Sequence, residues 1–415
     1  MYDEDLKNYI LGLLNSKFSE KLLQITAPTI GFEWGAIAKT PWLYDVIKAE
    51  DINSLVQTNI DISKADWDSF EISWDFVRHP MIPAFSDGAY LLENFYHVWQ
   101  GECNERFKQL KANEEELNRI FIDIYGLQDE LTPEVEDKDV TVRKADLQRD
   151  IKSLISYAVG CMFGRYSLDV PGLAYAGGEW DSNKYSTFLP DEDNCIPITD
   201  EEYFQDDIVG RFVEFIRVVY GDDTLEANLD FIADALGNKG KTSRDTIRQY
   251  FLNDFYKDHC QTYSVTGSGK RPIYWLFNSG KQNGFKALVY MHRWTPDTVG
   301  NLRVEYLHKM QIVYEKEIEN CQDIIDNSLN SREIAAATKR KEKLIKQLKE
   351  CKDYDALVGH IAGSRIGIDL DDGVKVNYRL VQTGKDGRFC EILADSKDIM
   401  IKENSEIWQN LVSSR

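Results

Sequence analysis

The stretch LHKMQIVYEKEIENCQDII, residues 307–325, is the clearest structural signal in this sequence. Its apolar residues recur at steps of three and four positions: Leu307, Met310, Tyr314, Ile318, Cys321 and Ile325. This spacing puts them on one face of an α-helix. The two successive four-residue steps depart from a strict heptad, so the pattern favours an ordinary packed helix over a left-handed coiled coil.

A second helix is predicted after a short polar interruption. The sequence NSLNS at residues 327–331 breaks the apolar stripe, and a lysine-rich stretch containing Leu344, Leu348 and Cys351 resumes it. Because the break is short, the two helices are expected to turn back on each other. We therefore predict a long antiparallel helical hairpin over residues 301–355.

Two β-rich runs come before the helical hairpin. RPIYWLF (residues 271–277) and FKALVYMH (residues 285–292) are separated by NSGKQNG, which carries two glycines and a lysine. Aromatic and β-branched residues favour strands, and the glycines favour a turn, so we predict a β-hairpin with a basic tip. Near the end of the chain, IDLDDGVKVNY (residues 368–378) alternates like an edge strand around a tight turn.

The rest of the chain shows mainly helical periodicity, so the predicted fold class is α+β, predominantly helical, with helical subdomains and small antiparallel sheets. The acidic stretch at residues 128–140, which contains a proline, is the best candidate boundary. The predicted regions are 1–45, a helical scaffold at 46–140, a helical region followed by the basic β-hairpin at 141–300, the helical hairpin at 301–355, and a C-terminal strand and helix segment at 356–415.

Composition indicates a globular protein of a reducing compartment. Hydrophobic residues make up 43% of the 415 positions, yet no run approaches the roughly 18–20 apolar residues that a membrane helix needs. The seven cysteines are scattered and form no C-x-x-C pair, which argues against a disulfide framework and against a zinc site. We expect a cytoplasmic location, no metal and no membrane partner.

The net charge of −21 is the wrong sign for a protein that simply coats nucleic acid. A local basic face remains compatible with this charge. Basic residues concentrate in one window, which holds Lys239, Lys241, Arg244, Lys270, Arg271, Lys281, Lys286, Arg293 and Arg303. Four aromatic residues are interleaved with them: Tyr274, Trp275, Tyr290 and Trp294.

This window predicts a DNA-binding groove in which the cations contact phosphates. Within it, Tyr274, Trp275 and Trp294 are candidates for stacking on bases. The alternative is an ordinary hairpin whose charged tip keeps it in solution. A second aromatic cluster, formed by Trp67, Phe70, Trp74 and Phe76, is open to the same two interpretations, base stacking or core packing.

No catalytic residue is predicted in this chain. The stretch ALGNKGKT at residues 235–242 nearly matches a phosphate-binding loop but has alanine in place of the first glycine. The six histidines form no H-E-x-x-H pattern, and no G-x-S-x-G sequence is present. These patterns give no support for an NTPase, a zinc hydrolase or a serine hydrolase.

Several long motifs resemble one family of enzymes. SYAVGCMFGRYSLDVPGLAYAGG, KRPIYWLF, ALVYMHRW, LRVEYL and IDLDDGVKVNY are similar, in this order, to segments of large single-chain DNA adenine methyltransferases related to type IIG restriction–modification enzymes. WDSFEISWDFVRHP and ERFKQLKANEEELNRIFIDIYGLQDELTPEV narrow the resemblance to the C-terminal half of the PglX family, the adenine-specific DNA methyltransferases of BREX phage-defence systems. YILGLLNSKF and IGFEWGAIAKTPW are similar to the end of a target-recognition domain, which we assign to residues 1–45.

The resemblance implies N6-adenine methylation of host DNA, with S-adenosylmethionine as the methyl donor. In this family an Asn/Asp-Pro-Pro-Tyr/Phe loop holds the flipped adenine. The present sequence contains no Pro-Pro dipeptide. We therefore expect no cofactor in this chain and expect S-adenosylmethionine to bind in a separate N-terminal half.

Two functions are compatible with this sequence. The first is the DNA-recognition and scaffold portion of a BREX-like adenine methyltransferase, with double-stranded DNA, the N-terminal methyltransferase half and other BREX proteins as partners. The second is an acidic protein-interaction module that binds defence partners and not DNA. They differ in whether the chain binds DNA in a salt-dependent manner.

Overall fold

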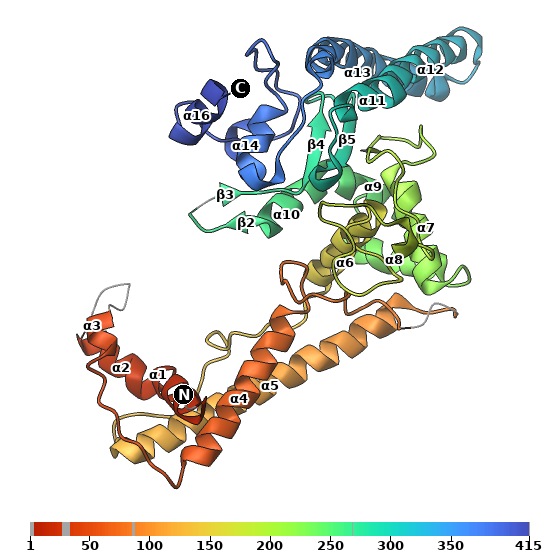
Figure 1. Cartoon of the computed structure of the whole chain (residues 1–415). Helices are drawn as coiled ribbons and strands as arrows, with labels where there is room; N and C mark the ends of the chain where they lie inside the picture. The colour runs from red at the N-terminus through yellow and green to blue at the C-terminus, as the bar shows by residue number, and fades with distance from the viewer. Residues whose placement is uncertain (1–3, 27–33, 85–87, 268, 415) are drawn as a thin grey trace. The chain divides into compact units, whose positions relative to one another are not determined.

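The computed structural model describes residues 4–26, 34–84, 88–267 and 269–414, and within them the chain divides into two compact units. Unit 1 comprises residues 1–81 and 94–147, and unit 2 comprises residues 82–93 and 148–415. The predicted fold class is confirmed, because helices dominate both units and the strands form small antiparallel sheets (Figure 1). The finer division into five regions stays a prediction.

Unit 1 is built from helices. They are α1 (Glu4–Leu14), α2 (Lys17–Thr26), the short α3 (Trp34–Ile37), α4 (Ala49–Trp67) and most of α5 (Leu92–Tyr125). Tyr9 of α1, Ile52 of α4 and Phe121 of α5 are fully buried in a shared core. A Cβ atom at Gly12 would lie 2.9 Å from a methyl group of Val56, so this glycine permits the close approach of α1 and α4.

The first half of unit 2 is a group of helices. They are α6 (Leu147–Met162), α7 (Ile208–Tyr220), α8 (Leu225–Leu236), α9 (Ser243–Asn253) and α10 (Phe255–Thr262). The side chain of Thr242 accepts a hydrogen bond from the backbone N–H of Asp245 at 3.1 Å and so caps α9. Between α6 and α7 lie the short 3₁₀ helix η1 (Ser182–Lys184) and strand β1 (Ile196–Pro197).

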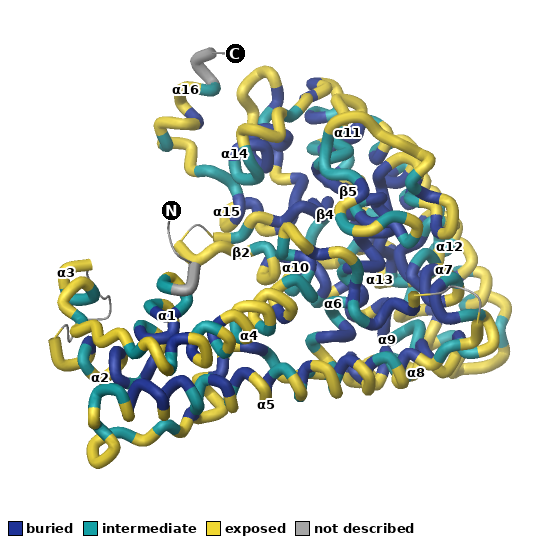
Figure 2. Tube along the Cα trace, turned by 60° about the horizontal axis from the view of Figure 1, so that its bottom comes forward, coloured by how far each residue is buried: buried dark blue, intermediate teal, exposed yellow. Residues whose placement is uncertain are grey.

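The predicted β-hairpin is present at the centre of unit 2. Strands β4 (Tyr274–Asn278) and β5 (Lys286–Tyr290) pair antiparallel with Leu276 opposite Leu288, and β1 joins the other side of β5. Nearly every residue of these two strands is buried, which appears as dark blue in Figure 2. A separate two-stranded sheet is formed by β2 (Ser264–Val265) and β3 (Gly269–Lys270).

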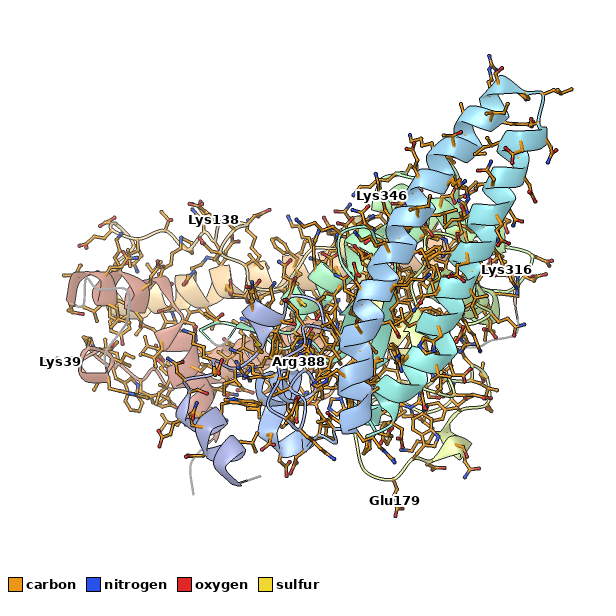
Figure 3. All side chains as sticks on the ribbon, turned by 90° about the horizontal axis from the view of Figure 1, so that it is seen from above. Lys39, Lys138, Glu179, Lys316, Lys346 and Arg388 are labelled. Carbon is orange, nitrogen blue, oxygen red and sulfur yellow. The ribbon has the colours of Figure 1, made fainter. Side chains whose placement is uncertain are left out.

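The predicted helical hairpin is confirmed. A 3₁₀ turn, η2 (Met291–Arg293), leads to α11 (Thr298–Leu302) and the π-helical turn η3 (Arg303–Leu307). These are followed by α12 (His308–Asn327) and α13 (Ser331–Ser364), which lie side by side (Figures 1 and 3). The predicted break coincides with the N-cap of α13, where the side chain of Asn330 accepts from the N–H of Arg332 at 3.0 Å.

The predicted edge strand at residues 368–378 is wrong. The segment forms the 3₁₀ helix η4 (Leu370–Asp372) and the start of α14 (Gly373–Leu380). The side chain of Asp369 accepts from the N–H of Asp371 at 3.0 Å, so the acidic residues start a helical turn instead of bending a strand. Two further helices, α15 (Ser396–Ile399) and α16 (Glu406–Ser414), end the chain.

In the described ranges, no helix combines the length and the apolar character that crossing a bilayer would require.

Candidate nucleic-acid interface

The aromatic residues of the basic window belong to the core. Tyr274, Trp275 and Tyr290 are each fully buried in the β4–β5 sheet. The indole N–H of Trp275 donates to the carbonyl of Pro272 at 3.1 Å. A base would have to unfold this sheet to stack on these rings, so Tyr274 and Trp275 are corrected from base-stacking candidates to core residues.

The third candidate, Trp294, is half-buried and also has a structural partner. Its indole N–H donates to the carbonyl of Ile366 at 2.9 Å, and its ring stacks on Phe277 with an angle of 7° between the planes. The ring therefore connects the β-sheet to the segment that follows α13. This arrangement gives no support to a role in stacking on DNA.

Two of the predicted cations are also structural. Lys286 is buried, its ammonium group donates to the carbonyl of Leu252 at 2.7 Å, and burial lowers its pKa. The guanidinium of Arg293 donates to the carbonyls of Asp191 at 2.7 Å and Glu192 at 3.0 Å, and lies over the ring of Trp180. Both cations hold backbone carbonyls inside unit 2, so neither is available to a phosphate group in this fold.

Four more predicted cations form ion pairs within the chain. Arg244 donates to both carboxylate oxygens of Glu226, at 2.7 and 2.6 Å, and Arg303 does the same with Asp355, at 2.8 and 2.9 Å. The remaining pairs join Lys239 to Asp254 at 3.3 Å and Lys270 to Asp395 at 3.1 Å. A phosphate group would have to compete with these carboxylates.

Three predicted cations, Lys241, Arg271 and Lys281, have exposed side chains. They lie on three separate segments: the turn before α9, the link between β3 and β4, and the β4–β5 loop. Their assignment to DNA stays a prediction. Of the nine cations in the basic window, these are the ones that could reach a phosphate without losing a partner in the described part of the chain.

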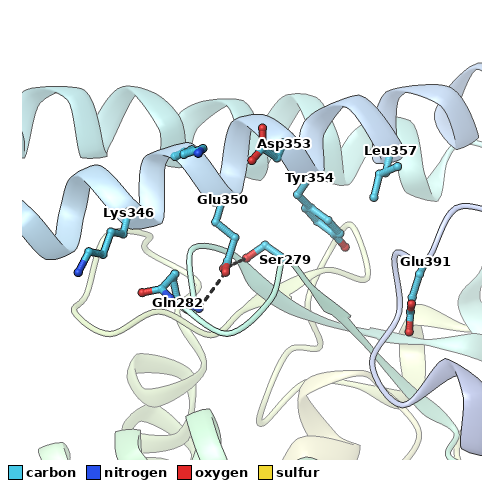
Figure 4. Close-up of a pocket in the computed structure, with 9 residues that line it drawn as sticks. Ser279, Gln282, Lys346, Glu350, Asp353, Tyr354, Leu357 and Glu391 are labelled. Carbon is cyan, nitrogen blue, oxygen red and sulfur yellow. Dashed lines mark hydrogen bonds between the residues drawn. The ribbon is translucent and has the colours of Figure 1, made fainter.

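The loop between β4 and β5 is anchored to helix α13 by one carboxylate, that of Glu350 (Figure 4). Its Oε1 accepts from the hydroxyl of Ser279 at 2.8 Å and from the N–H of Gly284 at 3.0 Å, and its Oε2 accepts from the N–H of Gln282 at 2.8 Å. A Cβ atom at Gly284 would lie 2.7 Å from the carbonyl oxygen of Gln347, so only glycine permits this close approach. The predicted basic tip of the hairpin is therefore docked on α13, with Lys281 still exposed.

A groove of about 440 Å³ lies where this loop meets α13. Its lining residues are Ser279, Gln282, Lys346, Lys349, Glu350, Asp353, Tyr354, Leu357 and Glu391 (Figure 4). Both lysines are exposed, and the ammonium group of Lys346 points away from the docked loop and helix. The groove thus carries mixed charge: α13 contributes Lys346, Lys349, Glu350 and Asp353, and Glu391 lies at the opposite end from Lys346.

Helix α13 presents a row of lysines that the prediction of site residues missed. Lys339, Lys343, Lys346 and Lys349 recur at steps of four, three and three, which places them on one helical face. Lys343 pairs with Asp200. Lys339, Lys346 and Lys349 are exposed and have no ion pair within the described ranges. We call Lys339, Lys346 and Lys349 the α13 lysine row; Figure 3 shows Lys346 on one side of the helix pair and Lys316 of α12 on the other.

A second cavity in unit 2, of about 570 Å³, is acidic. Asp191, Asp193 and Asp206 lie in its wall, and the hydroxyl of Tyr306 bonds to Asp193 at 2.9 Å and also contacts Asp206. Burial, and then the neighbouring Asp193, raise the pKa of Asp191 well above its usual range. Across the described segments, no three acidic, histidine or cysteine side chains converge as the ligands of a metal ion would.

The aromatic cluster near residue 70 divides between core and surface. Phe76 is buried, and the guanidinium of Arg143 lies 4.0 Å from the ring centre of Phe70. Trp67 is half-exposed and Trp74 is fully exposed. Core packing therefore holds for one part of the cluster, and the two tryptophans remain candidates for contact with a partner.

Unit 1 also carries a fixed segment with exposed apolar side chains, residues 41–47, which we call the pinned apolar segment. The hydroxyl of Tyr9 donates to the carbonyl of Leu43 at 2.9 Å, and that of Tyr125 donates to the carbonyl of Pro41 at 2.6 Å. The exposed fractions of its apolar residues are 48% for Trp42, 50% for Leu43, 48% for Tyr44, 75% for Val46 and 90% for Ile47. An exposed apolar patch on an ordered backbone is typical of an interaction surface.

Comparison with known proteins shows that the chain is similar to adenine-specific methyltransferases. It is 46% identical over 379 residues, 90% of its length, to the adenine-specific methyltransferase PglX of Lacticaseibacillus casei (strain Zhang). It is 36% identical over 432 aligned positions, 96% of its length, to the adenine-specific methyltransferase BrxX of Escherichia coli O9:H4 (strain HS). No protein-family model matches the chain.

These similarities confirm the predicted resemblance to the PglX family over nearly the whole chain. The chain spans about a third of the length of these relatives, 31% of the first and 34% of the second.

Proposed function

We propose that this chain is the DNA-recognition and scaffold portion of an adenine-specific DNA methyltransferase that marks host DNA in phage defence. The observation that carries the proposal is its 46% identity to PglX over 90% of its length. The chain has no Pro-Pro dipeptide, so the family's Asn-Pro-Pro-Tyr-type loop is not among its residues. We infer that methyl transfer and S-adenosylmethionine binding are carried out by another part of the methyltransferase.

The α13 lysine row is the surface that best fits a DNA backbone. A helix rises about 1.5 Å per residue, so Lys339 and Lys349 lie roughly 15 Å apart along α13. One strand of DNA presents a phosphate about every 3.4 Å along the duplex axis, so three exposed ammonium groups over this length can each reach a phosphate of the same backbone. Because these lysines have no internal carboxylate partner in the described ranges, phosphate contact does not require a native ion pair to break.

The pinned apolar segment supports the scaffold part of the proposal. We infer that Trp42 and Ile47 pack against the larger remaining portion of the methyltransferase, to which the relatives devote about two thirds of their length. Trp42→Asp together with Ile47→Asp is expected to abolish capture of the chain by the separately expressed remainder of the L. casei protein. Val98→Asp, which changes an exposed apolar residue of unit 1 on α5, is the matched control and should leave capture unchanged.

DNA binding by the purified chain tests the recognition part of the proposal. Fluorescence anisotropy with a random-sequence duplex, at salt concentrations from about 50 to 200 mM, is expected to give a negative slope of log K against log salt. Lys346→Ala with Lys349→Ala should reduce the steepness of this slope by about 0.9 per lysine. Incubation with duplex DNA and S-adenosylmethionine should yield no N6-methyladenine by mass spectrometry.

The matched control is Lys257→Ala with Lys316→Ala, which removes the same charge from exposed positions elsewhere in unit 2. This variant should keep the parent slope. If both double variants lose the same slope, binding follows net charge and not the α13 lysine row. Formation of N6-methyladenine by the isolated chain would contradict the scaffold assignment.

The acidic cavity favours a second candidate function, a protein-interaction module for basic partners. Asp191, Asp193 and Asp206 gather in one wall, and the chain as a whole carries a charge of −21. The absence of DNA binding at low salt, combined with binding of a lysine-rich peptide that is lost in Asp193→Asn, would support this function over DNA recognition.

A further inference from the structure

Unit 1 contains a groove that the proposed function does not use. It lies between α1, α4 and α5 and has a volume of about 350 Å³. This volume is at the small end of the range for ligand sites in proteins. Every lining residue belongs to unit 1, so the groove is complete within one unit.

The floor of the groove is apolar and its rim is polar. Val56, Leu110 and Leu117 are buried residues of the floor, and Leu11 and Ile60 extend the apolar surface toward solvent. Among the polar lining residues, the buried Asn118 is fixed, because its Oδ1 accepts from the N–H of Lys17 at 2.8 Å and its Nδ2 donates to the carbonyl of Pro133 at 3.1 Å. An apolar floor with a few fixed polar groups is the usual composition of a small-molecule site.

One ionisable side chain, that of Glu114, lines the groove. It is half-buried, and in the described ranges no hydrogen-bond or ion-pair partner is found for its carboxyl group. The nearby cation Lys111 is already paired with Asp137 at 2.8 Å. The residues that α1 and α4 contribute to the lining carry no charge, and Asp139 is the charged neighbour that acts on Glu114.

The carboxyl group of Glu114 is therefore exposed to a groove with no cation to balance it. Burial, with a smaller contribution from Asp139, raises its pKa to about 7. A bound cation would restore the ionised form, because an opposite charge within a few ångströms favours ionisation of a carboxyl group. The apolar floor would at the same time remove a short hydrocarbon stem from water, which favours binding.

We propose that this groove binds a primary alkylammonium group, with its ammonium on the carboxylate of Glu114 and its hydrocarbon stem on Val56, Leu110 and Leu117. The same chemistry is present in a free alkylamine and in the side chain of a lysine. A neutral alcohol offers the stem without the charge, and an anion is repelled by Glu114 and Asp139.

Calorimetric titration of the full chain with n-butylamine, with Nα-acetyl-lysine N-methylamide and with 1-butanol tests the proposal. Saturable binding of either amine at pH 8, with no binding of 1-butanol, is expected. Binding of both amines supports the shared chemistry, binding of n-butylamine alone indicates a free amine, and binding of the lysine derivative alone indicates a peptide source. Absence of saturable binding by both amines would overturn the proposal.

Proton release gives a readout that a nonspecific hydrophobic site would not show. A primary ammonium group stays protonated from pH 5.5 to 8, because its pKa is about 10.4. Binding should therefore displace a proton from Glu114 and release about half a proton per amine near pH 7, as measured in buffers of different ionisation enthalpy. Affinity should fall about ten-fold or more from pH 8 to pH 5.5 as Glu114 takes up a proton.

Glu114→Gln keeps the size and shape of the side chain and should lower the affinity at pH 8 by at least about ten-fold. Glu116→Gln, which changes an exposed carboxylate of the same helix paired with Arg119, should leave the amine affinity at pH 8 within about two-fold of the parent value. Unchanged affinity and proton release in Glu114→Gln would refute the assignment. The result is independent of DNA binding, because the α13 lysine row lies in unit 2 and the groove lies in unit 1.

Discussion

The basic window at residues 239–303 and the helix α13 are both rich in lysine and arginine, but they use these residues in opposite ways. In the window, Lys286 and Arg293 hold buried or partly buried carbonyls, and Arg303 is clamped by Asp355. On α13, Lys339, Lys346 and Lys349 are exposed without an ion pair in the described ranges. The local density of cations in a sequence therefore does not measure how many of them are free to bind a ligand.

The largest effect is expected for Arg248, an internal cation that falls in the same range of residues, 239–303, without being one of the nine predicted DNA contacts. Arg248 donates to Asp207 at 2.8 Å and to the carbonyl of Thr199 at 2.9 Å, and Asp207 is fully buried. Arg248→Ala leaves a buried carboxylate without its cation and should lower the free energy of unfolding by about 3–5 kcal/mol. Urea unfolding followed by circular dichroism measures this change.

The control for Arg248 is Arg217→Ala, which breaks an exposed pair with Asp222 and should cost at most about 1 kcal/mol. Equal losses of unfolding free energy in Arg248→Ala and Arg217→Ala would mean that internal cations stabilise the fold no more than exposed ion pairs do. The contrast between structural cations in this range and free cations on α13 would then not hold.

A smaller loss of stability is expected where the β4–β5 loop of the basic window contacts α13. Glu350→Ala removes the three hydrogen bonds that dock the β4–β5 loop on α13 and should lower the free energy of unfolding by about 2 kcal/mol. Glu342→Ala, at an exposed position of the same helix, should change it by less than about 0.5 kcal/mol. Hydrogen exchange of the Gln282 and Gly284 amides should accelerate in Glu350→Ala only; unchanged protection would show that the loop does not depend on this carboxylate.

The stability of the chain should depend on pH through Asp191, whose backbone carbonyl accepts a hydrogen bond from Arg293. The pKa of Asp191 is raised to about 7 in the folded chain, mainly by burial and then by Asp193. Between the ordinary pKa of an aspartate and pH 7, the folded chain holds a proton on Asp191 that the unfolded chain has lost. The free energy of unfolding should therefore fall as the pH rises through this range.

Asp191→Asn should flatten this fall, because an amide does not titrate and its Oδ1 can still accept from the N–H of Cys195. The measurement is the urea midpoint at several pH values from about 4 to 8. An unchanged pH profile in Asp191→Asn would assign the titration to another group of the cavity, such as Asp206, whose pKa is also raised.

Elements with a local signal could be predicted from the sequence. The apolar stripe from Leu307 to Ile325 predicted α12, and two runs of aromatic and β-branched residues around a glycine-containing break predicted the β4–β5 hairpin. The segment at residues 368–378 misled the same reasoning, because its alternation is short and Asp369 instead starts a helical turn. A pattern of few residues cannot separate an edge strand from the first turns of a helix.

The candidate site could be predicted only in part. Whether a cation is free to bind DNA depends on carboxylates that lie far away in the sequence and come close only in the fold. Lys270 meets Asp395, and Arg303 meets Asp355 only when η3 and α13 pack together. The residues next to these cations in the sequence give no pattern that predicts such ion pairs. The α13 lysine row had a usable signal, the recurrence of lysines on one helical face, and it could have been found by asking which face of the helix remains polar.

We propose that DNA contacts the α13 lysine row and not the basic window. This proposal is tested most directly by two triple variants of equal charge change, Lys339/Lys346/Lys349→Ala and Lys241/Arg271/Lys281→Ala, both made at exposed positions. The measurement is the slope of log K against log salt for a random duplex. We predict that the first variant loses about 2.7 from the steepness of the slope and that the second keeps it. Loss of slope in the second variant, with an unchanged slope in the first, would contradict the account and return the interface to the basic window.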